Sequence, residues 1–295
     1  KVSANATSNV VMMRVAGNTG VTLSRSSTLF QHVVCDGTSV RSVTQVDSEL
    51  NTLTVLGTVT VLGNAVFAGD IQKKTAGTSN FAAGVNAGNS IASGGNYNVA
   101  IGDEAGTAIT TGDNNVAVGY AALDANSTGH SNVAVGTNAL SANITHVANT
   151  MVGYQAGLST VADANTFVGY QCGQTTTTGT NNTALAVNAL YSNTSGSNNT
   201  AIGREALYSN TTASGNVAVG YQALDANTTG TSNVAFGIGA LGANTTASNN
   251  SAFGATSLDA NTTGTQNNAF GVNALTANTT ASYNSAFGTS ALGTN

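Results

Sequence analysis

The chain has 295 residues and a net charge of −5, and only 6% of its residues are charged, against roughly 25% in an ordinary soluble domain. It contains no proline or tryptophan, and this composition, with its low net charge, argues against a disordered chain. No apolar run approaches the ~20 residues of a membrane-spanning helix, and two widely separated cysteines make no disulfide framework or metal knuckle.

Charge is distributed unevenly along the chain. Residues 1–75 carry six of the seven basic side chains and four acids, whereas residues 76–295 carry only Arg204 against eight acids. Without a basic patch to neutralise phosphates, nucleic-acid binding is not expected. The sequence starts at Lys1 without a signal-peptide pattern, so we expect a processed chain or part of a longer one.

Residues 1–49 are predicted to form a small β domain or joint. Apolar runs at 10–15 and 29–34 are typical of strands, and Asp36-Gly37 is a strong hairpin signal before a return through Val40 and Val43.

Residues 50–75 repeat on a shorter period. Gly57, Gly63 and Gly69 are six residues apart, and alternating apolar residues precede each of them. Such short strands are not stable alone, so we expect a stem in which three chains wind together. Lys73 and Lys74 mark its boundary with the segment that follows.

Residues 76–295 consist of a repeat of about 17 residues, Asn-x-Ala-φ-Gly-x-x-Ala-Leu followed by a polar loop, where φ is bulky and apolar. We number each copy from its Asn, so that the Gly slot is position 5. Asn occupies position 1 in all thirteen copies, starting with Asn80, and the Gly slot starts with Gly84 and contains Ala186 once. The other members of these two columns are Asn98, Asn115, Asn132, Asn149, Asn165, Asn182, Asn199, Asn216, Asn233, Asn250, Asn267, Asn284, and Gly102, Gly119, Gly136, Gly153, Gly169, Gly203, Gly220, Gly237, Gly254, Gly271, Gly288.

The remaining columns are also regular. Position 3 is Ala in eleven copies, with Met151 and Phe167 as exceptions, and position 8 is Ala in eleven, with Cys172 and Ser257 as exceptions. Position 9 is Leu in nine copies and Gly in the other four. Internal repeats of this kind define the architecture before any other signal.

This repeat predicts an all-β chain, a parallel β-solenoid or β-roll of about thirteen coils. Seventeen residues are too few for a pair of helices, and the β-branched residues and Asn-Thr-Thr-Gly stretches favour strands and turns. Coils about 4.8 Å apart would stack into a rod on the order of 60 Å long. The Asn column either forms a hydrogen-bonded amide ladder or provides left-handed turn geometry, and Gly fits where backbones approach closely.

Strand alternation places positions 3 and 4 on opposite faces. Since a single solenoid buries one face, an Ala column on the second face predicts close packing against a neighbouring chain. We therefore expect a homo-oligomer and favour a homotrimer.

Residues 216–224 and 199–207 resemble repeats of bacteriophage tail-fibre proteins, and residues 53–63 resemble the stems of such fibres. The resemblance spans about residues 50–295 and implies a structural virion fibre that supports host attachment, often made with a C-terminal self-cleaving chaperone domain. The implied partners are further copies of the chain, other virion or appendage proteins at the termini, and a host cell-surface glycan or protein. The implied location is the virion or an extracellular surface, with no membrane insertion. The core motif also resembles the heads of trimeric autotransporter adhesins, although their repeat is shorter.

Three alternatives remain open: a bacterial trimeric adhesin head, a self-assembling extracellular filament, and an ice-binding solenoid. The last is weaker, because it needs flat, regular Thr columns, whereas Thr here clusters in loops after Asn.

No enzymatic, cofactor or metal site is expected. The three histidines, His32, His130 and His146, belong to no recognisable catalytic constellation, and we expect Cys172 to be a small buried residue. Cys35 is expected in a strand. The acidic pair Asp103-Glu104, the pair Arg204-Glu205, and Asp124, Asp225 and Asp259 of position 10 are expected at the surface, although the last three could surround a cation in a trimer. The tyrosines, mostly at position 6, are expected to pack along the rod, with glycan stacking as the alternative (Tyr120, Tyr154, Tyr170, Tyr191, Tyr208 and Tyr221).

Overall fold

A computed structural model describes residues 77–294 and the backbone of six short strands between residues 3 and 54. The chain divides into two compact units, Lys1–Gly69 and Asp70–Asn295. The predicted stem, 50–75, lies outside the described residues except for one strand in its first part, so the three-part division of the chain stays a prediction.

The first unit contains a four-stranded sheet and a two-stranded sheet. In the larger sheet the order is β1-β2-β3-β6, and each neighbouring pair is antiparallel. The smaller sheet pairs β4 with β5, and this confirms the hairpin expected around Asp36-Gly37, two residues that themselves lie outside the described part. The strands are β1 (Ser3–Ala4), β2 (Val10–Arg14), β3 (Gly20–Ser24), β4 (Val33–Cys35), β5 (Val40–Val43) and β6 (Leu53–Thr54).

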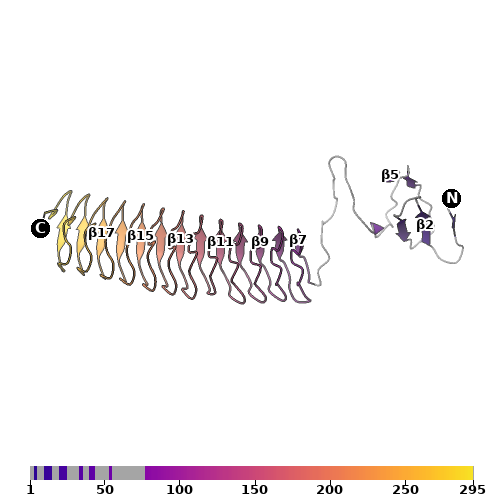
Figure 1. Cartoon of the computed structure of the whole chain (residues 1–295), viewed down its shortest axis with the longest axis horizontal. Coiled ribbons are helices and arrows are strands. Elements are labelled where there is room, and N and C mark those ends of the chain that lie inside the picture. The colour runs from indigo at the N-terminus through magenta and orange to yellow at the C-terminus, as the bar shows by residue number, and fades with distance from the viewer. Residues whose placement is uncertain are drawn as a thin grey trace. The chain divides into compact units, whose positions relative to one another are not determined.

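The second unit is a parallel β-solenoid, as predicted (Figure 1). Each coil contributes one three-residue strand, formed by positions 2–4, to a parallel sheet of thirteen strands in chain order. The described residues contain no helix. The strands are β7 (Phe81–Ala83), β8 (Val99–Ile101), β9 (Val116–Val118), β10 (Val133–Val135), β11 (Thr150–Val152), β12 (Thr166–Val168), β13 (Thr183–Leu185), β14 (Thr200–Ile202), β15 (Val217–Val219), β16 (Val234–Phe236), β17 (Ser251–Phe253), β18 (Asn268–Phe270) and β19 (Ser285–Phe287).

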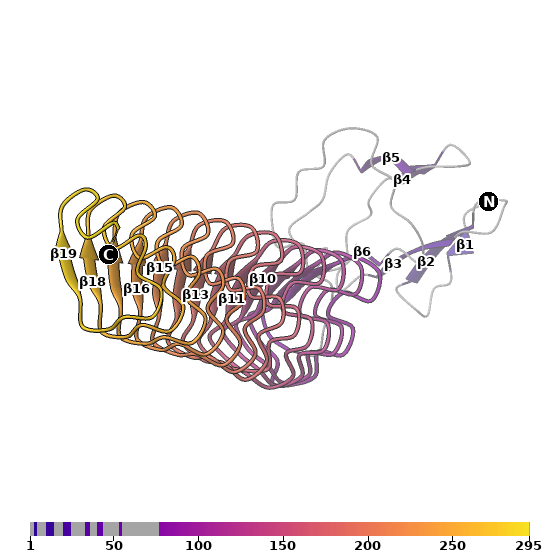
Figure 2. The ribbon, with the colours of Figure 1, turned by 60° about the vertical axis from the view of Figure 1, so that its left-hand side comes forward.

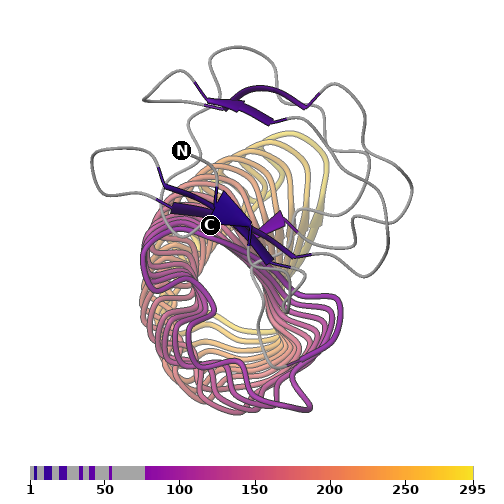
Figure 3. The ribbon, with the colours of Figure 1, turned by 90° about the vertical axis from the view of Figure 1, so that its right-hand side faces the viewer.

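Every strand pairs with its neighbours in the same register. Ala201 lies beside Ala218, and Ala218 beside Ala235, so each column of the repeat becomes a row along the rod. The loops stack as regularly as the strands (Figure 2), and viewed along the rod the coils follow one another around a common elongated outline (Figure 3). A coil of 16 residues, between Gly153 and Gly169, is accommodated without loss of strand register.

The two faces of the strands are exchanged relative to our expectation. Alanine at position 3 points into the solenoid and is fully buried, as at Ala218, whereas the bulky residue at position 4 points outward, with Phe236 51% exposed. The reason is that the interior is narrow. Buried side chains of positions 1, 8, 9 and 12 already fill it, so position 3 has room for little more than a methyl group.

Position 9 explains why its column contains only Leu and Gly. This residue adopts a left-handed backbone, with φ of 52° at Leu224 and 57° at Gly157. Gly adopts this conformation freely, whereas Leu is strained there but fills the core, being fully buried at Leu224.

Where position 9 is Gly, another residue of the same coil supplies the missing volume. A Cβ at Gly157 would lie 2.7 Å from the Met151 sulfur, and one at Gly173 would overlap the Phe167 ring. In the first two coils Ile91 and Ile109 of position 12 play this part opposite Gly88 and Gly106. The irregular copies of the repeat therefore conserve core volume, consistent with close-packed protein interiors.

The position 5 slot requires glycine for two reasons. Its twelve glycines have φ between 120° and 147°, and a Cβ at Gly220 would overlap the carbonyl oxygen of Gly237 in the next coil. Ala186 occupies this slot with φ of 116°, a conformation that costs a non-glycine residue about 1–3 kcal/mol.

We therefore expect Ala186→Gly to stabilise the solenoid by about 1 kcal/mol, since relief of strain exceeds the entropy that glycine adds to the unfolded chain. Gly220→Ala should have the opposite effect. Thermal denaturation followed by circular dichroism measures both changes, and a lower melting temperature for Ala186→Gly would contradict this account of the slot.

Candidate functional site

The most highly ordered feature of the solenoid is the row of buried asparagines at position 1. The Asn216 Oδ1 atom accepts a hydrogen bond from the backbone N–H of Asn233, 2.9 Å away in the next coil. Its Nδ2 atom donates to the carbonyl oxygen of Gly230, at position 15 of its own coil, at 2.9 Å. Each such side chain therefore ties its coil together and joins it to the next one.

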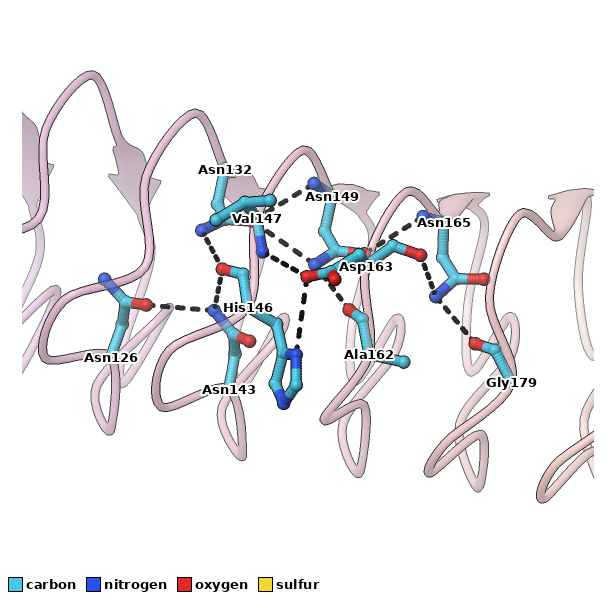
Figure 4. Close-up of polar contacts among 10 residues, drawn as sticks. All are labelled: Asn126, Asn132, Asn143, His146, Val147, Asn149, Ala162, Asp163, Asn165 and Gly179. Carbon is cyan, nitrogen blue, oxygen red and sulfur yellow. Dashed lines mark hydrogen bonds and ion pairs between the residues drawn. The ribbon is translucent and has the colours of Figure 1, made fainter.

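This arrangement recurs along the row. The backbone N–H of every position 1 asparagine from Asn98 to Asn284 donates to Oδ1 of the preceding one, at 2.8–3.1 Å. Figure 4 shows the stretch from Asn132 to Asn165. Because these amides are buried and an unsatisfied buried polar group is costly, an apolar residue cannot replace them without loss.

A second asparagine row, at position 12, was not anticipated. Within it the side-chain amide of each coil donates to Oδ1 of the preceding coil, as from Asn227 to Asn210 at 3.0 Å. The same amide of Asn227 also donates to the Gly230 carbonyl, at 3.0 Å, so this one oxygen accepts from both rows. The row comprises Asn126, Asn143, Asn193, Asn210, Asn227, Asn244, Asn261 and Asn278. The 17-residue spacing of these residues was the signal that identifies them.

The second row is interrupted by Thr160 and Thr176, in the two coils that carry Met151 and Phe167. The Oδ1 atom of Asn143 and the Oγ1 atoms of both threonines are buried and have no hydrogen-bond partner among the described residues. The first row continues through these coils without a break, so it alone carries the side-chain amide ladder there.

The residues considered for catalysis do not come together. His146 lies 3.3 Å from the carboxylate of Asp163, at a partly exposed site, while His130 contacts Ser131 and His32 lies outside the described residues. Cys172 is buried in the core, and burial raises the pKa of its thiol to about 12, so it is a poor nucleophile near neutral pH. Cys35 is the last residue of β4.

The acidic residues of position 10 are more suggestive. Asp225 and Asp259 flank Gly242, where a Cβ would lie 3.6 Å and 2.7 Å from their respective Oδ1 atoms. Asp124 is in another part of the rod, where it accepts a hydrogen bond from Ser141. Within residues 77–294, no three His, Cys, Asp or Glu side chains form a group that could hold a metal ion.

Burial raises the pKa of both Asp225 and Asp259, and for Asp225 the charges of Asp259 and Glu205 raise it further, against backbone hydrogen bonds that lower it. A carboxyl group with a raised pKa in the folded state binds its proton more tightly there than in the unfolded chain. Its ionised form therefore costs stability at neutral pH, and the cost disappears as the pH falls through the folded-state pKa.

We expect Asp225→Asn to raise the melting temperature at neutral pH and to have little effect in acid, where the wild-type carboxyl is already protonated. Melting curves at a series of pH values test this. Asp103→Asn, a change at a carboxylate for which no such environment exists, serves as the control, and a benefit of Asp225→Asn that persists in acid would rule out the electrostatic cause.

The tyrosines pack along the rod rather than presenting their ring faces. Tyr154 and Tyr170 stack at a centroid distance of 5.2 Å and an interplanar angle of 13°, and Tyr191 and Tyr208 stack in the same way. The guanidinium group of Arg204 lies 5.8 Å from the ring centre of Tyr221. Stacking of sugars on ring faces is therefore obstructed within these pairs.

Comparison of the chain with protein-family models, with curated proteins and with solved structures gives no significant match. Among the described residues, none forms a helix of the length and apolar character that crossing a membrane requires. Inferences about function therefore rest on the geometry of the solenoid itself.

Proposed function

We propose that this chain is the rod of a homotrimeric virion fibre, a phage tail fibre or similar appendage, that holds a host-recognising part away from the particle and so supports attachment. The observation that carries this proposal is the continuous register of thirteen strands joined by the position 1 asparagine row. A quasi-one-dimensional array in which each coil bonds to the next suits a stiff spacer.

The outward face of the sheet supports assembly with other copies. Positions 2 and 4 of β7–β19 contain no charged residue, and toward the C-terminal end Phe236, Phe253, Phe270 and Phe287 stack in one exposed column. A face about 60 Å long and about 10 Å wide covers roughly 600 Å², near the roughly 800 Å² that each partner buries in a standard stable interface. An uncharged apolar face of this size is typical of a protein–protein contact.

The native mass of the purified full chain tests the assembly. We expect three times the chain mass of 29.1 kDa, and elongated particles by electron microscopy. Phe253→Lys, which puts a charge in the centre of the phenylalanine column, should yield single chains, whereas Thr128→Lys, in an exposed loop, should not. A stable single chain in the wild type would refute the trimer.

Location on a virion needs a separate measurement. Gold-labelled antibodies against the purified chain should decorate an appendage of intact particles from the source culture. Decoration of cell envelopes alone would instead favour the bacterial adhesin.

A further inference from the structure

We propose that one side of the solenoid, built from hydroxyl side chains, binds the surface of ice. This hydroxyl face comprises positions 14 and 16 of seven consecutive coils. The position 14 row is Thr178, Ser195, Thr212, Thr229, Thr246, Thr263 and Thr280, and the position 16 row is Thr180, Ser197, Ser214, Thr231, Ser248, Thr265 and Ser282. The proposal is independent of the fibre assignment.

The polar loops of the repeat are regular enough for this role. The objection to an ice-binding solenoid was that its threonines cluster in loops, but these loops stack in register. On one side of the hydroxyl face the backbone N–H of Thr211 donates to the carbonyl of Thr228, and on the other side the N–H of Gly215 donates to the carbonyl of Ser197. Backbone bonds between coils therefore bracket both rows and fix their repeat at the spacing of parallel strands, about 4.8 Å.

Side-chain bonds add to this order. At position 13, Thr194 Oγ1 donates to the carbonyl of Thr211 at 3.0 Å, and the pattern recurs in the coils that follow. At position 16, Ser248 Oγ accepts from the backbone N–H of Thr231 at 2.9 Å, and Ser282 Oγ accepts from Thr265 in the same way. These side chains are ordered before any ligand arrives, so binding costs little conformational entropy.

The position 14 row is the part that is available to a ligand. All seven of its residues are exposed, and among the described residues none of their hydroxyl groups makes a hydrogen bond to another protein group. The intervening position 15 is a Gly or Ala, as at Gly230 and Ala247, which keeps the strip between the rows free of bulky side chains.

A repeating array fits a repeating ligand. Six intervals of about 4.8 Å extend the face over about 29 Å, and positions 13–17 of these coils carry no charged residue. Water can bridge hydroxyl groups with hydrogen bonds nearly as good as direct ones, while the threonine methyl groups exclude loosely held water. An ordered lattice of water offers partners along the whole length of both rows, which a small soluble ligand does not.

A crystalline polysaccharide is the other periodic ligand, and the aromatic residues disfavour it. Stacking of sugar rings needs free aromatic faces, but the stacked tyrosine pairs cover one another. Among the coils nearer the N-terminus, Asp113 and His130 replace the hydroxyl residue of position 16. The paired rows are thus confined to the seven C-terminal coils, and the rest of the rod provides an internal control.

The test is partition of the fluorescently labelled full chain into a slowly growing ice front. We expect several-fold enrichment of the wild type in ice relative to a non-binding protein, and loss of that enrichment in Thr212→Lys/Thr229→Lys. The matched control is Thr111→Lys/Thr128→Lys, which makes the same changes at position 14 of two adjacent coils outside the hydroxyl face. Melting curves of both variants verify that they fold.

Three outcomes overturn the proposal. The wild type fails to enter ice, both variants lose enrichment equally, or the wild type binds crystalline cellulose or chitin powder while remaining excluded from ice. Neither the trimer measurement nor the antibody labelling depends on any of these results, so failure of the ice proposal leaves the fibre proposal intact.

Discussion

Replacing Asn216 by Ala is expected to destabilise the solenoid by about 2–4 kcal/mol. The change leaves the buried N–H of Asn233 without its acceptor, at a cost of about 1–3 kcal/mol, and removes the bond from Nδ2 to the Gly230 carbonyl. That carbonyl still accepts from Asn227, so it is not left unpaired. For a protein of this size the melting temperature should fall by about 4–16 °C.

Asn268→Ala is the matched control, because this asparagine lies at outward position 2 of β18 and its side chain makes no hydrogen bond to any described residue. Amide hydrogen exchange locates the effect: protection should be lost first in the coils on either side of Asn216, since each coil contacts only its neighbours. Equal destabilisation by the two variants would show that the position 1 row has no special role.

The second large effect concerns the exchange of core volume between positions 3 and 9. We expect Ala218→Phe and Leu224→Gly each to destabilise the solenoid by at least about 2 kcal/mol, the first by overpacking and the second by leaving a cavity. Together they reproduce the pairing of Phe167 with Gly173, whose Cβ the phenylalanine ring excludes. The double variant should therefore be more stable than the sum of the single changes predicts.

A double-mutant cycle from denaturation curves measures this coupling, which should amount to about 1–3 kcal/mol. Ala218→Phe combined with Leu275→Gly, three coils away, is the control and should be additive. If the adjacent pair is additive as well, the two irregular coils do not compensate by volume, and their composition needs another reason.

The solenoid itself could be predicted from the sequence, because a fixed period of about 17 residues leaves few architectures. Which face of the strand points inward could not. Alternation places Ala218 and Val219 on opposite sides, but the pattern is the same for either choice. The width of the interior decides the question, and it depends on side chains contributed by the rest of the coil.

The second asparagine row was present in the sequence and missed for a local reason. Asn227 precedes Thr-Thr-Gly, a composition typical of an exposed turn, whereas in the structure it is fully buried. The left-handed backbone of Leu224 could not be foreseen, because leucine disfavours this conformation. The alternation of leucine with glycine in that column was its one visible sign.

The bonds that hold the coils together join uncharged groups almost throughout. In residues 77–294 the ion pairs are limited to His146 with Asp163 and Arg204 with Glu205, both at the surface. Dissolved salt screens charges at the surface but does little to a buried amide that donates to a carbonyl. A rod built in this way keeps its rigidity in fresh water and in brine alike.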